Sequence, residues 1–265
     1  MPVKLFILGL PGSGKSSAAR YIRTYIAKHS NNWSTERKND YTILHRMCYV
    51  EKDARMHPTE YDGFDVLEHS AFNSALKRLN SEVLEEHEGS GNENQLTTIE
   101  FSRNDYNIAL EEFFLEFLTR FHKSIYFLFI ETDISVCKER IQERVSKPLC
   151  NRSADDHPVS DFIFETYYRR DEQHYCDSVV KRLQERFYVP DSHIQVILNS
   201  ELTDKDFQEK VGMFVGGILS EEITVRSSPL PQSYEEELEQ HIAENESGTE
   251  IQASLTNALA EAIPA

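Results

Sequence analysis

A glycine-rich stretch near the start of the chain has the residue types and spacing of a phosphate-binding loop. It matches the pattern G-x-x-x-x-G-K-[ST] and comprises Gly9, Leu10, Pro11, Gly12, Ser13, Gly14, Lys15 and Ser16. The glycines let the backbone curl so that successive N–H groups point inward, and a following helix adds the positive end of its dipole. In such a loop the lysine reaches the β- and γ-phosphates and the hydroxyl after it ligates Mg²⁺. We therefore expect residues Gly9 to Ser17 to bind a nucleotide polyphosphate, with Lys15 in catalysis and Ser16 on the metal.

The segments on either side of the loop support this interpretation. The apolar run Val3–Leu8 suits a buried parallel strand, and residues 17–26 have the pattern of an amphipathic helix. Strand, loop and helix thus follow one another in the order that a phosphate-binding loop requires.

Two carboxylates are candidates for the general base. Glu100 ends an apolar strand-like run, and a carboxylate there can hold Mg²⁺ or take the proton of an acceptor hydroxyl. Asp53 follows the apolar stretch Tyr41–Val50, which we interpret as the second strand. The alternative for Glu100 is an exposed acid at a strand end. The sequence leaves open which of the two is the base.

Arg140 and Arg144 are candidate phosphate ligands on a helix that follows another apolar run. They lie one turn apart and therefore share a helix face, although that face could also be an ordinary charged, solvated one. The next segment, residues 147–161, is polar and broken by prolines, which suits a lid that excludes water during transfer. It contains a further candidate, Arg152.

Short apolar runs alternate with longer helical patterns, which is typical of βαβ units and a parallel sheet. We expect strands at Lys4–Leu8, Tyr41–Val50, Leu96–Phe101, Ile125–Glu131 and Ile194–Leu198. We expect helices at Gly14–Lys28, Val66–Glu86, Tyr106–Phe121, Ile134–Val145 and Asp204–Leu219, and a surface loop at Glu86–Asn94. The predicted fold is an α/β three-layer sandwich with a five-stranded, mainly parallel sheet.

The loop, the strand end at Glu100 with Arg103 after it, and the helix of Arg140 and Arg144 resemble the P-loop NTPases of the nucleoside and nucleotide kinase group. Adenylate-kinase-like and deoxynucleoside-kinase-like enzymes belong to that group, and the resemblance covers Val3–Leu219. It implies ATP and Mg²⁺ as cofactors, a LID-like insertion, and arginines that close over ATP. The implied reaction is phosphoryl transfer to a small hydroxyl- or phosphate-bearing acceptor, with a nucleoside or nucleotide favoured.

The sequence departs from that group at two places. Deoxynucleoside kinases carry adjacent Glu-Arg at the comparable strand end, whereas Phe101 and Ser102 stand between Glu100 and Arg103 here. The Asp-Gly-[Phe/Tyr]-Pro strand end of adenylate kinases is absent, because residues 62–65 read Asp-Gly-Phe-Asp. The aromatic residues Tyr61, Phe64 and Phe72 could stack an acceptor or fill the core. The acceptor therefore stays open.

Two other functions remain compatible with the loop. One is a regulatory ATPase that switches a protein partner, and the other is a 5'-hydroxyl polynucleotide kinase, which needs a basic groove. The cations that could form such a groove are Arg20, Arg23, Lys28, Arg37 and Lys38. A GTPase is disfavoured because no Asn-Lys-x-Asp element is present, and a net charge of -17 argues against a DNA-coating role.

Cysteine spacing, hydropathy and the distribution of charge give the remaining expectations. The four cysteines show no metal-ligand spacing and read as reduced thiols of a cytoplasmic protein, and no apolar run approaches the ~20 residues of a membrane span. After Arg226 there is no Lys or Arg, while this last segment carries eight Glu residues. We expect a kinase-like domain at residues 1–226 and an acidic, flexible tail at 227–265, joined by a proline-containing linker and able to bind a protein partner.

Overall fold

The fold is described from a computed structural model, for residues 2–30, 32–89, 94–121, 124–147, 157–168 and 176–227. Its centre is a five-stranded sheet in the order β2-β5-β1-β6-β7, and every neighbouring pair is parallel. The strands are β1 (Val3–Gly9), β2 (Ser34–Asn39), β5 (Gln95–Phe101), β6 (Ile125–Glu131) and β7 (Ile194–Leu198). The predicted α/β fold is confirmed, with all five strands parallel.

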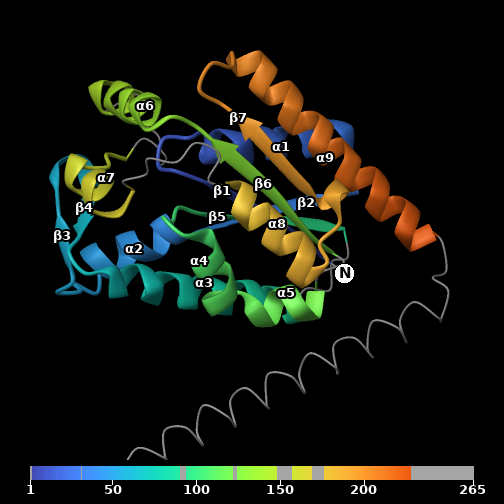
Figure 1. Cartoon of the computed structure of the whole chain (residues 1–265), viewed down its shortest axis with the longest axis horizontal. Helices are drawn as coiled ribbons and strands as arrows, with labels where there is room; N and C mark the ends of the chain where they lie inside the picture. Colours follow the sequence, from blue (N-terminus) through green and yellow to red (C-terminus); the bar gives the residue numbers. More distant parts are fainter. Residues whose placement is uncertain are drawn as a thin grey trace, which may run out of the picture. The chain divides into compact units, whose positions relative to one another are not determined.

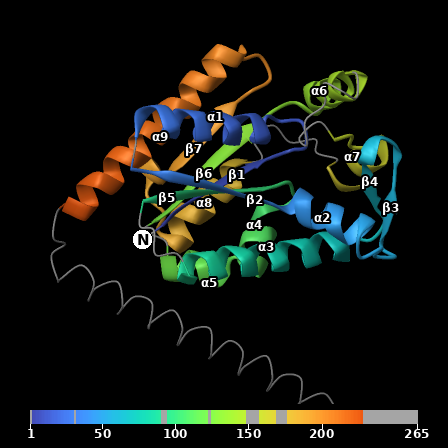
Figure 2. The same cartoon turned by 180° about the vertical axis from the view of Figure 1, so that it is seen from behind.

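Helices cover both faces of the sheet and complete three layers (Figures 1 and 2). One face carries α1 (Lys15–His29) and α9 (Asp204–Ser227), and the other carries α3 (His69–Gly89), α4 (Tyr106–Phe113), α5 (Leu115–Phe121) and α8 (Cys176–Phe187). The two central strands, β1 and β6, are buried along their whole length, which is why both are apolar except for Lys4 in β1 and Glu131 at the end of β6. Their Phe6 and Phe127 rings stack with centroids 5.2 Å apart.

The prediction of a strand at Tyr41–Val50 is wrong, because this stretch forms helix α2 (Asp40–Tyr49). Its buried residues, Ile43, Leu44, Met47 and Cys48, recur with the spacing of a helix face. The second strand in the chain is instead the polar segment β2, which ends at Asn39 and leads directly into α2. This shift moves the carboxyl end of the second strand from Val50 to Asn39.

A small lobe follows α2 at the carboxyl edge of the sheet. It contains the antiparallel pair β3 (Met56–Pro58) and β4 (Phe64–Val66), the short 3₁₀ turn η1 (Glu60–Asp62) between them, and α7 (Asp161–Tyr167) packed on β4. The Tyr167 hydroxyl donates to the carbonyl of Val66 at 2.9 Å. Segments about a hundred residues apart are thereby joined into one wall.

The other predicted helices are present with shifted ends, whereas α7 and α8 were not predicted. Helix α6 (Ile134–Ser146) is confirmed, the predicted helix at 106–121 is interrupted at Phe114, and α9 runs past Leu219. Helix α3 continues to Gly89, so the predicted loop does not begin at Glu86. Residues 90–93, and residues 148–156 with Arg152 in the predicted insertion, lie outside the described residues.

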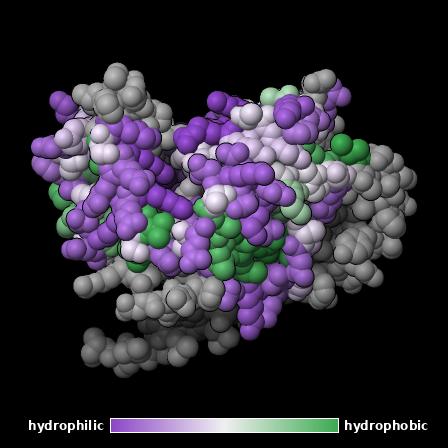
Figure 3. Space-filling view, turned by 90° about the horizontal axis from the view of Figure 1, so that it is seen from above, coloured by the Kyte–Doolittle hydropathy of each residue, from purple (hydrophilic) through white to green (hydrophobic). Residues whose placement is uncertain are grey.

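The chain divides into two compact units, Met1–Ile218 and Leu219–Ala265, with the division inside α9. The predicted linker and acidic tail lie outside the described residues except for Ser227, so the boundary at 226 stays a prediction. Among the described residues no helix has the length and apolar character of a membrane span. Figure 3 shows one face of the molecule, where hydrophilic residues surround separate hydrophobic patches.

Candidate active site

The phosphate-binding loop joins β1 to α1 and needs its glycines for two different reasons. Gly12 and Gly14 have φ values of 83° and 112°, in the left-handed region that residues with a Cβ rarely adopt. A Cβ on Gly12 would also lie 2.5 Å from the carbonyl oxygen of Cys137 in α6. The N–H of Gly9 donates to the hydroxyl of buried Tyr106 at 2.8 Å. The curled loop is thus fixed from both sides before any ligand binds.

The carbonyl oxygen of Ser13, at the top of the loop, is held by side chains from two later strand ends. It accepts from Asn199 Nδ2 at 2.8 Å, from Thr132 Oγ1 at 3.3 Å and from Arg140 at 3.5 Å. Arg140 also donates to the carbonyl of Asn199 at 2.8 Å. Arg140 therefore braces the loop and does not line the cavity described below, whereas Arg144, one turn later, does.

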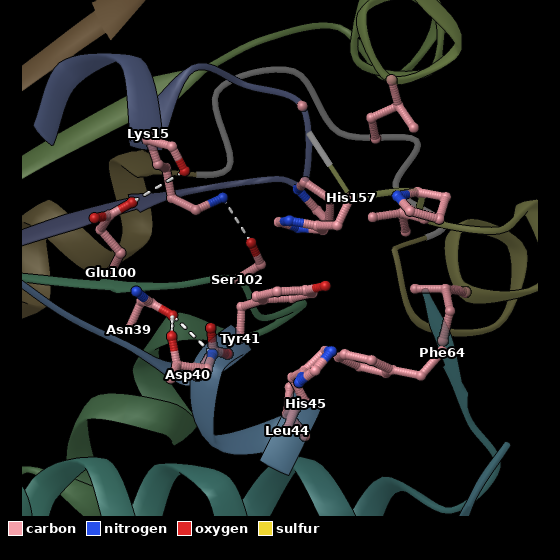
Figure 4. A pocket seen from close by; sticks show the side chains of 18 of the residues that line it. Lys15, Asn39, Asp40, Tyr41, Leu44, His45, Phe64, Glu100, Ser102 and His157 are labelled. Atoms are coloured by element: carbon pink, nitrogen blue, oxygen red, sulfur yellow. Dashed lines mark hydrogen bonds between the residues drawn. The ribbon is translucent and has the colours of Figure 1, made fainter. Parts of the chain in front are cut away.

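Lys15 points into the centre of the loop (Figure 4). Its Nζ donates to the carbonyls of Gly9 and Leu10, at 2.9 and 2.8 Å, and to Ser102 Oγ at 2.7 Å. Burial lowers the pKa of Lys15 to about 8, against the opposing charges of Asp40 and Glu100. The ammonium group thus occupies the position where it would exchange these neutral partners for phosphate oxygens.

Glu100 lies at the carboxyl end of β5, beside the loop. It is 3% exposed, and its Oε2 accepts from the hydroxyl of Ser16 at 3.3 Å. Arg37 at the end of β2 binds the same carboxylate through Nε and, at 3.1 Å, through Nη2. A hydroxyl and a carboxylate oxygen side by side are ligands that Mg²⁺ prefers, so Ser16 and Glu100 fit the predicted metal site.

Asp40 is a second buried carboxylate at the site, and the sequence analysis missed it. It begins α2 and lies 2.6 Å from Arg103, whose guanidinium also donates to the carbonyl of Phe72 at 3.0 Å. Arg103 is itself 5% exposed, so its charge is compensated inside the protein. Asp40 lines the cavity next to Lys15, at the position directly after the second strand.

Asp53, the other predicted base, lies elsewhere. Its carboxylate binds Arg55, with distances of 2.9 Å to Nε and 2.6 Å to Nη2, and this pairing lowers the pKa of Asp53 to about 2. Asp53 is not among the residues that line the cavity. The sequence placed one of its two candidate bases after the second strand, and the shift of that strand moves this position from Asp53 to Asp40.

A cavity of about 410 Å³ extends from the loop to the small lobe (Figure 4). Near the loop it is lined by Lys15, Ser16 and Glu100, and further out by Tyr41 and His45 of α2. The lining continues with Phe64 and Phe72, of which Phe72 is also part of the hydrophobic core, and with Ser102, Arg144, His157 and Tyr168. Tyr61 is 55% exposed and does not line it.

Aromatic rings form the outer wall of the cavity. The Tyr41 ring stacks on His157, with centroids 3.5 Å apart, and on Phe64 at 5.3 Å. Tyr41 comes from α2, Phe64 from β4 and His157 from the segment before α7, so three separate elements meet at this ring. The cavity thus has a charged end at the loop and an aromatic end at the small lobe, and its size is that of a small-molecule site.

No family model and no curated protein matches the sequence. Among solved structures, a sugar kinase from Janibacter sp. matches with 14% identity and a TM-score of 0.42, over 82% of this chain and 95% of its own. The Mycobacterium tuberculosis APS kinase CysC, in complex with AMPPNP and APS, matches with 11% identity and a TM-score of 0.44, over 82% and 99%. Chaetomium thermophilum Kti12, in complex with ADP-AlF3, matches with 16% identity and a TM-score of 0.42, over 80% and 98%.

These similarities do not identify an activity or a substrate for this chain. The nucleotide-binding loop and the parallel sheet are features of its own sequence and structure, and they establish the P-loop fold.

Proposed function

We propose that the protein transfers the γ-phosphoryl group of ATP, with Mg²⁺, to a hydroxyl or phosphate oxygen of a small molecule, a nucleoside or a nucleotide. One observation carries the proposal: the loop that would hold the phosphates opens into the same cavity as an aromatic wall and a buried carboxylate, Asp40. A regulatory ATPase needs only the loop that holds the phosphates, whereas a transferase also needs room for a second molecule beside the γ-phosphate.

The loop residues Gly9 to Ser17 would bind the phosphates through their N–H groups, and Lys15 would neutralise the β- and γ-phosphates. Ser16 and Glu100 would hold Mg²⁺, which supplies charge neutralisation on the phosphate oxygens when bound. Arg144 lines the cavity and would contact the transferring group, while Arg140 keeps Ser13 and the loop in place. Arg37 would keep the Glu100 carboxylate oriented toward Ser16.

As the oxygen of an acceptor hydroxyl attacks the γ-phosphorus, the hydroxyl proton would pass to a carboxylate and the bond from the γ-phosphorus to the bridging oxygen of the β-phosphate would break, so that ADP leaves. Asp40 and Glu100 both line the cavity, and we assign the base to Asp40 because Glu100 already faces the metal ligand Ser16. Asp40→Asn should lower the acceptor-dependent rate by about a hundredfold or more while nucleotide affinity is retained. Glu100→Gln should instead weaken Mg²⁺-dependent nucleotide binding.

The test measures ATP consumption with Mg²⁺, in the presence and absence of pooled nucleosides and nucleotides. Acceptor-dependent turnover in the wild type, its loss in Lys15→Ala and Asp40→Asn, and its retention in Asp53→Asn would support the proposal. Asp53→Asn is a matched control, because it makes the same change at a carboxylate outside the cavity. Slow ATP hydrolysis that no acceptor stimulates would point to the regulatory ATPase instead.

A polynucleotide kinase receives less support from the charges. Two of the five cations considered for a basic groove are compensated, Arg37 by Glu100 and Lys38 by Glu86 at 3.7 Å. Turnover with 5'-hydroxyl oligonucleotides, added as a separate pool, would reverse this assignment.

A further inference from the structure

The turn between β3 and β4 has a backbone conformation that costs energy. Tyr61 and Asp62 are consecutive residues with φ values of 59° and 63°, although neither is glycine. A left-handed conformation at a residue with a Cβ persists only where its surroundings hold it, and such residues cluster at ligand-binding sites. The surroundings of this turn must therefore hold it in place, and the turn is a candidate part of a ligand-binding site.

Two tyrosines of α2 hold the turn. The hydroxyl of Tyr41 donates to the carbonyl of Asp62 at 3.3 Å, and that of Tyr49 donates to the carbonyl of Gly63 at 2.5 Å. The turn also closes on itself, because the N–H of Thr59 donates to the carbonyl of Gly63 at 2.9 Å. These bonds fix the backbone of the turn relative to α2.

The turn presents the Asp62 carboxylate to the cavity beside an imidazole. Oδ2 of Asp62 lies 3.1 Å from Nε2 of His45, and both residues line the cavity. The His45 ring is stacked on Tyr49, with centroids 4.6 Å apart, while the Asp62 side chain is 73% exposed. Within the described part of the chain, Nε2 of His45 is buried and has no aligned hydrogen-bond partner. The exposed Asp62 carboxylate thus has hydrogen-bonding capacity left for a molecule in the cavity.

We infer that Asp62 and His45 form the specificity element of the acceptor site, and that they recognise an exocyclic amino group at the acceptor's far end. A carboxylate accepts hydrogen bonds and repels a carbonyl oxygen presented in the same place. Among nucleosides and nucleotides, those with an exocyclic amino group should be preferred over their counterparts with a carbonyl there. This inference rests on the proposed function and adds the choice of acceptor to it.

The position of the pair fits such a role. Lys15 and Glu100 form the loop end of the cavity, whereas His45 and Asp62 belong to the lobe end, where Tyr41 and Phe64 supply ring surfaces. A planar ring against those surfaces would turn its edge groups toward the carboxylate. The reacting hydroxyl or phosphate would remain at the other end, next to Asp40 and the loop.

The experiment compares matched acceptors in the wild type and in Asp62→Asn. The probes are cytidine with uridine and adenosine with inosine, each as nucleoside and as 5'-monophosphate, and the readout is kcat/KM with ATP and Mg²⁺. We expect the amino member of a pair to be favoured by about tenfold or more, which is the range for a hydrogen bond to a charged group. Asp62→Asn should reduce that preference toward unity, mainly through KM.

Asn is suited to this test because it adopts the left-handed conformation more readily than most residues, so the turn should survive. Glu60→Gln is the matched control: it removes one charge from the same turn at a residue that does not line the cavity, and it should keep the wild-type preference. His45→Gln should raise KM for the amino member with little change in kcat.

Different results would overturn the inference about Asp62 and the proposed function. Equal use of both members of each pair, or a preference that Asp62→Asn leaves intact, would overturn the inference while the kinase activity stands. Turnover with none of the probes would overturn the proposed acceptor class and this inference with it.

Discussion

At the scale of single residues, Lys15 gives a prediction about pH. Its pKa is lowered to about 8 in the nucleotide-free protein because it is buried. Bound phosphates favour the charged ammonium and raise that pKa, so binding takes up a proton wherever the free lysine is neutral. Below pH 8 the lysine is charged in both states and affinity should be level. Above pH 8 affinity should fall, by up to about tenfold per pH unit.

The measurement is the Kd of a non-hydrolysable ATP analogue between pH 7 and 9.5, by calorimetry in two buffers of different ionisation enthalpy. Proton uptake on binding at pH 9 is the specific signature. Lys15→Arg keeps its charge throughout this range and serves as the control. A Kd that does not change between pH 7 and 9.5 would contradict the assigned role of Lys15.

Residues whose chemistry follows from a local motif could be predicted, while those placed by a neighbouring element could not. Lys15 and Ser16 follow from the loop pattern, and Glu100 follows from its position at the end of an apolar strand. Asp40 and Arg103 are far apart in the sequence and acquire meaning only when β2 and β5 lie side by side. Arg140 and Arg144 share a helix face. Only the contacts of Arg140 with Ser13 and Asn199 show that Arg140 holds the loop, whereas Arg144 lines the cavity.

At the scale of elements, α2 positions the residues of the proposed acceptor site. Its sequence was mistaken for a strand because residues 42–50 contain β-branched and aromatic residues, which favour strands. The true strand β2 reads Ser-Thr-Glu-Arg-Lys-Asn and pairs only with β5, so a polar sequence is compatible with its place at the sheet edge. Tertiary position overrode local propensity at both segments, and the error made Asp53 the candidate base in place of Asp40.

The start of α2 yields a prediction about stability. Asn39 Oδ1 accepts from the N–H and from the hydroxyl of Thr42, both at 2.8 Å, and thereby caps the helix. Asn39→Ala should lower the free energy of unfolding by about 1 kcal/mol, whereas Asn39→Ser should stay close to wild type. Because Asp40, Tyr41 and His45 lie on the first turns of α2, Asn39→Ala should also raise the acceptor KM.

Urea unfolding of the three proteins, with KM measured alongside, checks this prediction. If Asn39→Ala is as stable as the wild type, packing of the buried face of α2 is enough to hold the helix without its cap.

At the scale of the whole molecule, the order of strands and helices was predictable because βαβ units leave a strong periodic signal. The buried strands β1 and β6 are apolar except for Lys4 and Glu131, and they lie at the predicted places. The small lobe was not predictable, since β3 and β4 have three residues each and gain their stability from packing against α2 and α7. The sequence therefore predicted the phosphate-binding loop and left the acceptor unassigned.

The last prediction concerns the acidic tail. Deleting residues 227–265 should change the free energy of unfolding by no more than about 0.5 kcal/mol and leave nucleotide binding intact, because the tail's sequence has a proline-containing start and no sustained apolar face. The rival is a docked helix anchored by Leu255, Leu259 and Ile263, whose loss should cost several kcal/mol. Thermal unfolding of the truncated and full chains separates the two, since about ten degrees of destabilisation would exceed any effect expected of a separable arm. A change of Leu255, Leu259 and Ile263 to Ser in the full chain is the companion test: if the tail is separable, the melting temperature should stay where it is.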